Sequence, residues 1–163
     1  MKMDYNKILT DEEFMEIKQH GSSAYPFQYY YDNLELFDFH CIEWHWHREF
    51  EFLYVESGEV TCGIGEKQII LSEGEAIFIN SKILHRFYAP SGGIIPNFVC
   101  MPEFIAPENS LIYKKYILPI ISSNIYFQRF QTDELWQTKI IQTMIKIMEI
   151  QGNEKIRELA LSL

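Results

Sequence analysis

Short runs of alternating apolar and polar residues fill the first two thirds of the chain. β-Branched and aromatic residues dominate these runs, and Gly, Asn, Ser and Pro separate them, which is typical of strands joined by tight turns. After a turn at residues 32–33, the predicted strands are residues 34–40, 42–47, 49–55, 59–64, 67–71, 75–80, 85–89 and 95–101. Because no helical pattern interrupts them, their spacing predicts an antiparallel sandwich or barrel.

A short helix is predicted before the strands, over residues 9–21. Thr10 is a good N-cap, Glu13 completes a capping box, and Gly21 can end the helix in the left-handed conformation. Its apolar face is small, so we expect the helix to lie on a larger body.

The pattern changes after residue 101. Asn109 or Ser110 can cap a short helix that reaches residue 118, where Pro119 is expected to end it. Residues 125–130 have the composition of one more strand.

A longer helix is predicted over residues 133–151, with Thr132 as its N-cap and a break at residues 152–153. Its apolar residues recur at helical spacing, as they do again in a second pattern that runs to Leu163. Because that second pattern shows no C-cap, we expect the natural polypeptide to continue.

Size and composition narrow the classes of protein that remain. A chain of 163 residues is expected to form one compact domain with an appended helical segment. The net charge of −9, without a basic cluster, argues against nucleic-acid binding by this chain itself. Three widely spaced cysteines indicate reduced thiols and a cytoplasmic protein, and no apolar run is long enough to span a membrane.

Four residues have the chemistry of metal ligands. His45 and His47 leave the same face of a predicted strand, Glu51 has the same parity, and His85 begins a separate strand. Three imidazoles and a carboxylate suit a divalent transition metal such as Zn, Ni, Fe or Mn. Alternatively, these side chains form hydrogen bonds with a bound molecule or with one another.

The spacing of these residues resembles the two motifs of the cupin family. His45, His47, Glu51 and the later Gly58 match the first motif position by position. In the second motif Gly74 and His85 match, whereas Asn80, Lys82 and Ala89 replace its Pro, Gly and Asn. The resemblance implies a mainly β fold, a cupin double-stranded β-helix or jelly-roll barrel, over about residues 25–101.

A narrower resemblance is to the sensor domain of AraC-type transcriptional regulators. It is carried by residues 44–51, by residues 74–80 and by the pair at 84–85. It implies an N-terminal arm and effector-binding barrel over residues 1–130, followed by a helical dimerisation segment over 131–163. The DNA-binding half, with two helix-turn-helix units, is absent from this sequence.

From this resemblance we expect a regulator that senses a small polar effector, such as a sugar, and does not act as an enzyme. A homodimer would form through residues 133–163, DNA would be bound only through the absent domain, and no membrane would be involved. The expected pocket residues are His45, His47, Glu51, His85, Trp44, Trp46 and Phe87. The alternatives are a metal-dependent cupin oxygenase or isomerase, whose metal the four ligand-type residues would hold, and a dimerising scaffold with an empty barrel.

Overall fold

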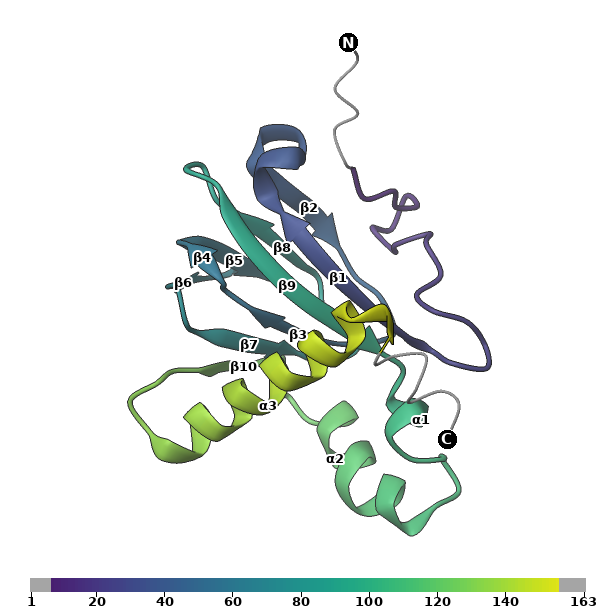
Figure 1. Ribbon diagram of the computed structural model, residues 1–163. Coiled ribbons are helices and arrows are strands. Elements are labelled where there is room, and N and C mark those ends of the chain that lie inside the picture. The colour runs from purple at the N-terminus through teal and green to yellow at the C-terminus, as the bar shows by residue number, and fades with distance from the viewer. Residues whose placement is uncertain (1–6, 156–163) are drawn as a thin grey trace.

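Two antiparallel sheets face one another in the computed structural model, which describes residues 7–155 (Figure 1). The larger sheet has the strand order β1 (Phe27–Asn33), β9 (Gly93–Cys100), β3 (Phe50–Tyr54), β7 (Ala76–Ile79) and β10 (Phe127–Phe130), with β4 (Ser57–Gly58) paired to β9. The smaller sheet has the order β2 (Cys41–His45), β8 (His85–Tyr88), β5 (Val60–Ile64) and β6 (Lys67–Leu71). The predicted antiparallel architecture is confirmed, and the strands predicted from residue 42 onwards all form.

The β5–β6 hairpin shows how the turn residues set the register. Ile64 pairs with Lys67, so only Gly65 and Glu66 form the connection. Gly65 has φ +55°, a left-handed conformation that glycine adopts without a steric penalty.

The interior between the two sheets is apolar toward β5, β6 and β7. Alternation along each strand sends every second side chain inward. The residues of this core are Leu34, Phe37, Ile42, Leu53, Val55, Val60, Cys62, Ile64, Leu71, Ile77, Ile79, Phe87, Ala89 and Ile95. The polar site residues share this interior, so the core fixes the strands that hold them.

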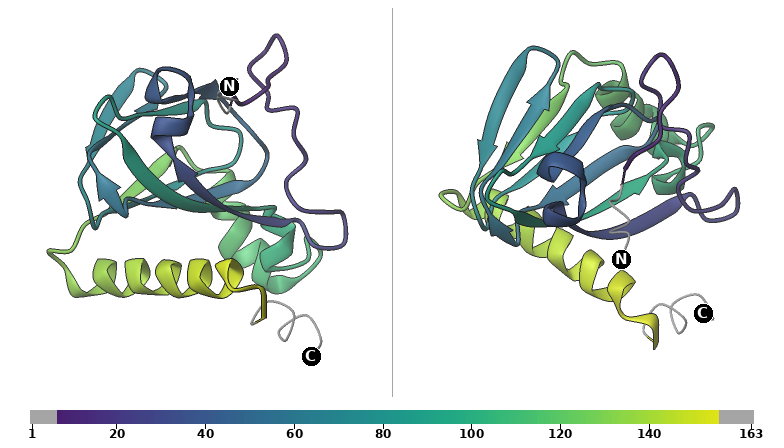
Figure 2. Two further views of the ribbon diagram at one scale, coloured as in Figure 1. Left: turned by 45° about the horizontal axis from the view of Figure 1, so that its top comes forward. Right: turned by 90° about the horizontal axis from the view of Figure 1, so that it is seen from above.

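Helices cover the outer face of the six-stranded sheet. The long helix α3 (Leu135–Gly152) lies along that face, as Figure 2 shows, and buries Ile141, Met144 and Met148 against it. Beside it are α1 (Pro102–Ile105) and a helical segment formed by the π-helical turn η3 (Tyr113–Ile117) and α2 (Leu118–Ile121). No helix within residues 7–155 is long and apolar enough to cross a membrane.

The predicted helix over residues 9–21 does not form. Residues 10 and 16 make an antiparallel bridge, Met15 makes a parallel bridge to Trp46, and Phe14 has φ +66°. The side chain of Asp11, rather than that of Thr10, accepts backbone hydrogen bonds, from Glu13 and Met15. The capping-type residues therefore stabilise a turn, and the segment packs on the barrel in an extended form.

The prediction of a strand at residues 34–40 is also wrong. Its place is taken by two short 3₁₀ helices, η1 (Leu34–Leu36) and η2 (Asp38–His40), while residues 32–33 end β1 instead of forming a turn. The Asn33 side chain accepts a hydrogen bond from the Glu35 N–H, which favours the first of these helical turns.

The helical boundaries after residue 101 differ in two places. Pro119 does not end its helix, because it lies in the first turn of α2, where no N–H is required, directly after the π-helical turn. The helix α3 begins at Leu135, two residues later than predicted, so Thr132 is not its N-cap. The predicted cap at Ser110 is confirmed by the Tyr113 N–H bond to its Oγ, as is the break at residues 152–153.

The division into residues 1–130 and 131–163 stays a prediction. The second helical pattern near Leu163 lies outside the described residues.

Met144→Ala should destabilise the protein by about 2–5 kcal/mol, because it removes a buried side chain from the contact between α3 and the sheet. Urea unfolding of this variant measures the change, and Lys146→Ala, on the exposed side of the same helix, is the matched control. Equal midpoints for the two variants would contradict the packing of α3 on the sheet.

Candidate metal centre

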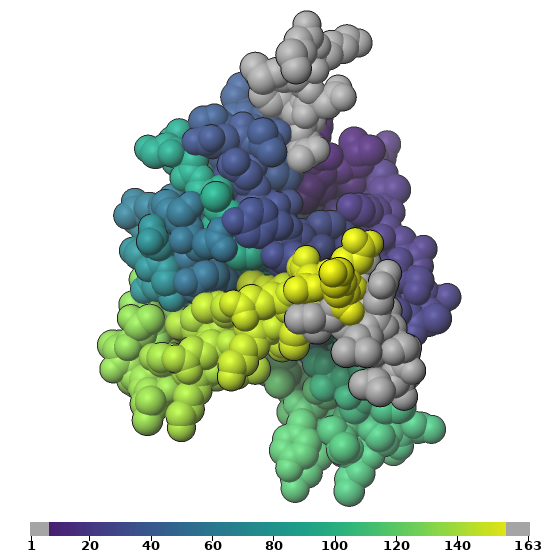
Figure 3. All heavy atoms as spheres, in the orientation of Figure 1, coloured from purple at the N-terminus to yellow at the C-terminus, as the bar shows by residue number. Residues whose placement is uncertain are grey.

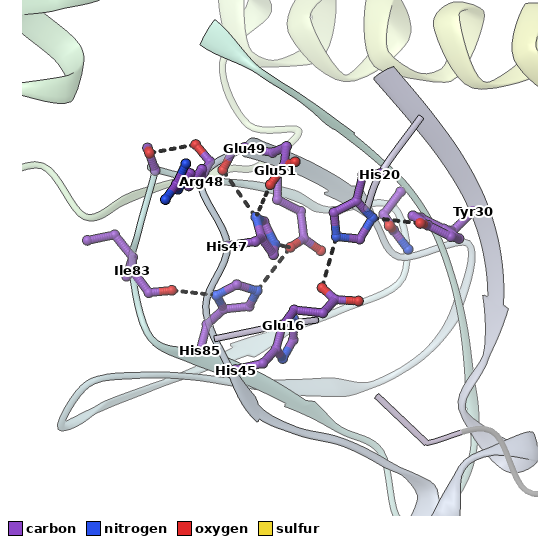
Figure 4. Close-up of polar contacts among 12 residues, drawn as sticks. Glu16, His20, Tyr30, His45, His47, Arg48, Glu49, Glu51, Ile83 and His85 are labelled. Atoms are coloured by element: carbon purple, nitrogen blue, oxygen red, sulfur yellow. Dashed lines mark hydrogen bonds and ion pairs between the residues drawn. The ribbon is translucent and has the colours of Figure 1, made fainter. Parts of the chain in front are cut away.

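Three strands and one loop bring the four ligand-type residues together. His45 ends β2 and pairs directly with His85 at the start of β8, while Glu51 lies on β3 and His47 in the short connection between β2 and β3. All four are buried, and one potential ligand atom from each lies within 4.8 Å of the others. The structure therefore brings the four side chains together as predicted, and Figure 4 shows them directed toward one centre.

Backbone carbonyl groups fix the tautomer of all three rings. Nδ1 of His45 is 2.8 Å from the Glu43 carbonyl oxygen, Nδ1 of His85 is 2.7 Å from that of Ile83, and Nδ1 of His47 is 3.2 Å from that of Glu49. A carbonyl oxygen can only accept, so each Nδ1 carries the proton. In the neutral ring Nε2 is then left with a free lone pair, which is the form that binds metals.

The carboxylate of Glu51 lies between two of these nitrogens. Its Oε2 is 2.9 Å from Nε2 of His85 and 3.1 Å from Nε2 of His47. An acceptor oxygen facing two lone pairs in a buried site is unfavourable unless a positive charge lies among them. A proton on one ring or a metal ion at the centre supplies that charge. The buried group of three histidines and one glutamate therefore fits a metal ion.

The pKa values of the group reflect this need for positive charge. Burial alone would raise the pKa of Glu51, but hydrogen bonds with His47 and His85 bring it below its usual range. Burial alone would lower the pKa of His85, but its hydrogen bond to Glu51 raises that pKa above the ordinary value. Burial lowers the pKa of His45 to about 3, and the neighbouring His85 acts in the same direction. The Glu51 carboxylate thus favours the protonated form of His85.

A cavity of about 500 Å³ opens from this group toward the N-terminal segment. His45, His47 and Glu51 lie at one side of it, with apolar walls that include Phe87. Residues 7–9 and 16–18 and His20 form another wall, so the N-terminal segment contributes directly to the cavity.

The segment is attached to the barrel next to the ligand residues. The Trp46 N–H donates to the Phe14 carbonyl, and the Glu16 N–H donates to the Trp46 carbonyl, each at 2.9 Å. His20 bonds through Nδ1 to the Tyr30 hydroxyl at 2.6 Å and through Nε2 to Glu16 at 2.9 Å (Figure 4). Sequence patterns gave no signal for this network, because it joins residues from a turn-like segment to β1.

The two tryptophans expected in the pocket lie elsewhere. Trp44 packs against Gly63 and beneath the guanidinium of Arg86, and the Trp46 indole N–H donates to the Glu13 carbonyl. Neither is among the residues that line the cavity, which corrects that expectation. The reason is the alternation of the strand: residues 44 and 46 have the opposite parity to His45 and His47.

Two of the three departures from the second motif, Asn80 and Lys82, can be explained by their local structure. The Asn80 side chain donates to the carbonyls of Ile120 and Ile125, both at 2.8 Å, and so joins the β7–β8 loop to the helical segment. Lys82 has φ +61°, a conformation that glycine favours, and its N–H donates to the His47 carbonyl at 2.8 Å. The replaced residues therefore leave the four ligand positions intact.

Residues 41–95 match the family model of the cupin domain, which confirms the cupin domain and, with the two antiparallel sheets, the cupin fold. A curated relative is the uncharacterized HTH-type transcriptional regulator YdeC of Bacillus subtilis (strain 168), which is 25% identical over 147 residues. The match covers 88% of this chain and 50% of that protein, so the chain spans about half the length of the relative.

Two solved structures resemble smaller parts of the chain. An RmlC-like cupin from Shewanella frigidimarina NCIMB 400 is 23% identical with a TM-score of 0.41, over 45% of this chain and 65% of that one. A predicted oxalate decarboxylase from Thermotoga maritima is 20% identical with a TM-score of 0.36, over 37% of this chain and 56% of that one.

The metal-free protein should lose stability as the pH rises above 6.5. The pKa of His85 is raised in the folded state, so its contribution is fully present below the unfolded value of 6.5 and is lost as the pH rises through the folded value. His20 has a raised pKa as well: burial lowers it, but its bond to Glu16 outweighs that effect. Urea midpoints should be compared from pH 6.5 upward and below the ordinary thiol pKa of 9.0, so that cysteine ionisation does not contribute.

Glu51→Gln should flatten this dependence, because it removes the carboxylate that raises the pKa of His85. His40→Asn, whose ring bonds to the Pro90 carbonyl and belongs neither to the ligand group nor to the cavity lining, is the control. A profile in Glu51→Gln as steep as in the native protein would show that the site does not cause it.

Purified protein should bind one equivalent of a divalent transition ion at the four-residue group. His85→Ala should weaken binding by more than the roughly 10–100-fold typical of a lost outer-shell partner, because it removes a ligand. Elemental analysis and competition with a chelating dye measure the affinity. Binding that is unchanged in His85→Ala would place the ion elsewhere.

Proposed function

We propose that this chain is the effector-sensing and dimerising part of an AraC-type transcriptional regulator. The observation that carries the proposal is that the N-terminal segment forms a wall of the cavity beside the buried ligand group. An effector in that cavity would touch both the rigid barrel and the segment. The similarity to a HTH-type transcriptional regulator over 88% of the chain supports the same assignment.

The proposed effector is a small polar metabolite such as a sugar. A cavity of about 500 Å³ is within the range of small-molecule sites. His45, His47, Glu51 and His85 would hold a divalent ion (Zn, Ni, Fe or Mn), and Phe87 would supply apolar contact. A bound ion supplies a positive charge that attracts an effector oxygen.

The proposed signal is a change in how the N-terminal segment packs on the barrel. Trp46 lies between two ligand residues and makes both backbone bonds to the segment. An effector that prefers the packed arrangement would shift the population toward it, and only such a preference can transmit a signal.

A homodimer through residues 133–163 is part of the proposal. The helix α3 lies on the surface of the molecule, as Figure 3 shows, and Leu135, Trp136 and Ile150 on it are exposed. DNA would be bound by a part of the cytoplasmic regulator outside these residues, as the name of the relative suggests. No membrane partner is proposed.

A metal-dependent enzyme of the oxygenase or isomerase type is the second candidate. The Glu16–His20–Tyr30 network favours it, because the ring of His20 lies 5.5 Å from that of His47 and could move a proton beside a bound substrate.

Titration of the metal-loaded protein with neutral sugars tests the proposal. An effector should raise the thermal stability, slow proteolysis within residues 7–20 and change the distance between labels on the two α3 helices of a dimer. Tyr30→Phe, which removes the hydroxyl bonded to His20, should speed that proteolysis severalfold. Tyr31→Phe is the control, since the Tyr31 hydroxyl bonds to the exposed Glu56.

If no sugar changes stability, proteolysis or dimer geometry, sensing of this class is wrong. Turnover of a bound ligand by the loaded protein, lost in His20→Gln, would establish the enzyme instead.

A further inference from the structure

The wall of the cavity formed by β1 and β9 carries a second polar group, separate from the four ligand-type residues. Asp32 and Tyr30 on β1 and Asn97 on β9 all line the cavity. Tyr30 pairs with Asn97 across the two strands, and Asp32 pairs with Ile95. These positions follow from alternation, which turns residues 30 and 32 inward while the intervening Tyr31 is exposed.

Asn97 holds the Asp32 carboxylate in place. Its Nδ2 donates to Oδ2 of Asp32 and to the Ile95 carbonyl, each at 2.9 Å, and Asn97 is itself buried. With both amide hydrogens used, the orientation of the carboxamide is fixed. The carboxylate is therefore positioned by the fold before any ligand arrives.

Most of the hydrogen-bonding capacity of Asp32 is unused. A carboxylate offers about four acceptor positions, and within residues 7–155 the Asn97 amide is the one side-chain donor bonded to it. Lys18 lies near enough to act on its charge but makes no ion pair with it in that range. Burial raises the pKa of Asp32 to about 6, which reflects the cost of leaving an ionised group without donors.

Two polar groups on the barrel wall of the cavity are thus of opposite character. The group of His45, His47 and Glu51 would present a metal ion, which attracts oxygen lone pairs, whereas Asp32 attracts hydrogen-bond donors. Apolar side chains, among them Phe87, lie along the same cavity. A ligand carboxylate would suit the first group but would meet repulsion at the second.

We propose that Asp32 is the specificity-determining residue of the cavity and that it accepts a hydrogen bond from an O–H or N–H group of the effector. The ligand class is then a neutral polyol or an amino alcohol, and carboxylic acids are rejected. This inference rests on the proposed sensing function and assigns its selectivity to one residue.

Calorimetric titration of the zinc-loaded chain with erythritol, ethanolamine and glycolate tests the inference. Erythritol, ethanolamine or both should bind at millimolar concentration, and glycolate at least about tenfold more weakly, because only glycolate brings a second negative charge near Asp32. Comparing the affinities for erythritol and ethanolamine shows whether a hydroxyl or an ammonium group is the preferred donor.

Asp32→Asn should weaken the binding of the better probe about 10–100-fold, as expected for loss of a hydrogen bond to a charged group, and should reduce the discrimination against glycolate. The variant keeps an oxygen that can accept from Asn97, and its urea midpoint checks that it folds. Asp38→Asn, on the short helix η2 and not itself among the residues that line the cavity, is the control.

Tighter binding of glycolate than of either donor probe by the native protein would overturn the inference, whatever the variant does. So would equal binding by Asp32→Asn, or no binding of either donor probe. None of these results alters metal binding or the proteolysis test above, so failure here is distinct from failure of the sensing function.

Discussion

A buried carboxylate that lies between two imidazole nitrogens imposes the main constraint on this structure. Glu51 cannot face the Nε2 atoms of His47 and His85 without a positive charge, because their other nitrogens already donate to the backbone. The barrel therefore has a position for a proton or a metal ion built into its interior. The strands that supply these residues also carry the apolar core, so the site and the stability of the fold depend on the same pairing.

The surroundings of this group connect it to the outside of the barrel. Trp46 turns its indole away from the cavity and uses its backbone to bind the N-terminal segment. Successive residues at the end of β2 and just after it therefore serve the site and its cover alternately. The segment then adds His20 and Glu16 to the polar lining. The residue that attaches the N-terminal segment, Trp46, is thus directly adjacent in the chain to the ligand-type residues His45 and His47.

Alternation and motif spacing were sufficient to predict the strands from residue 42 onwards and the four ligand-type residues. The same alternation, applied to Trp44 and Trp46, would have placed them on the other face. The N-terminal segment could not be predicted, because Thr10 and Asp11 suit a helix cap and a turn equally well, and contact with Trp46 decides between them. Asp32 and Asn97 were missed because their pairing joins residues 65 positions apart.

The loop between β7 and β8 has a wider consequence. Ser81 donates to the Arg48 carbonyl and Lys82 to that of His47, while Asn80 donates to Ile120 in α2 and to Ile125 in the connection before β10. Three successive residues thus connect the backbone of a ligand residue to the helices on the opposite side of the sheet. A barrel whose motif kept proline and glycine here would lack the Asn80 amide and its bonds. In this protein the substituted motif hydrogen-bonds the ligand loop to α2, so a shift of either would break bonds to the other.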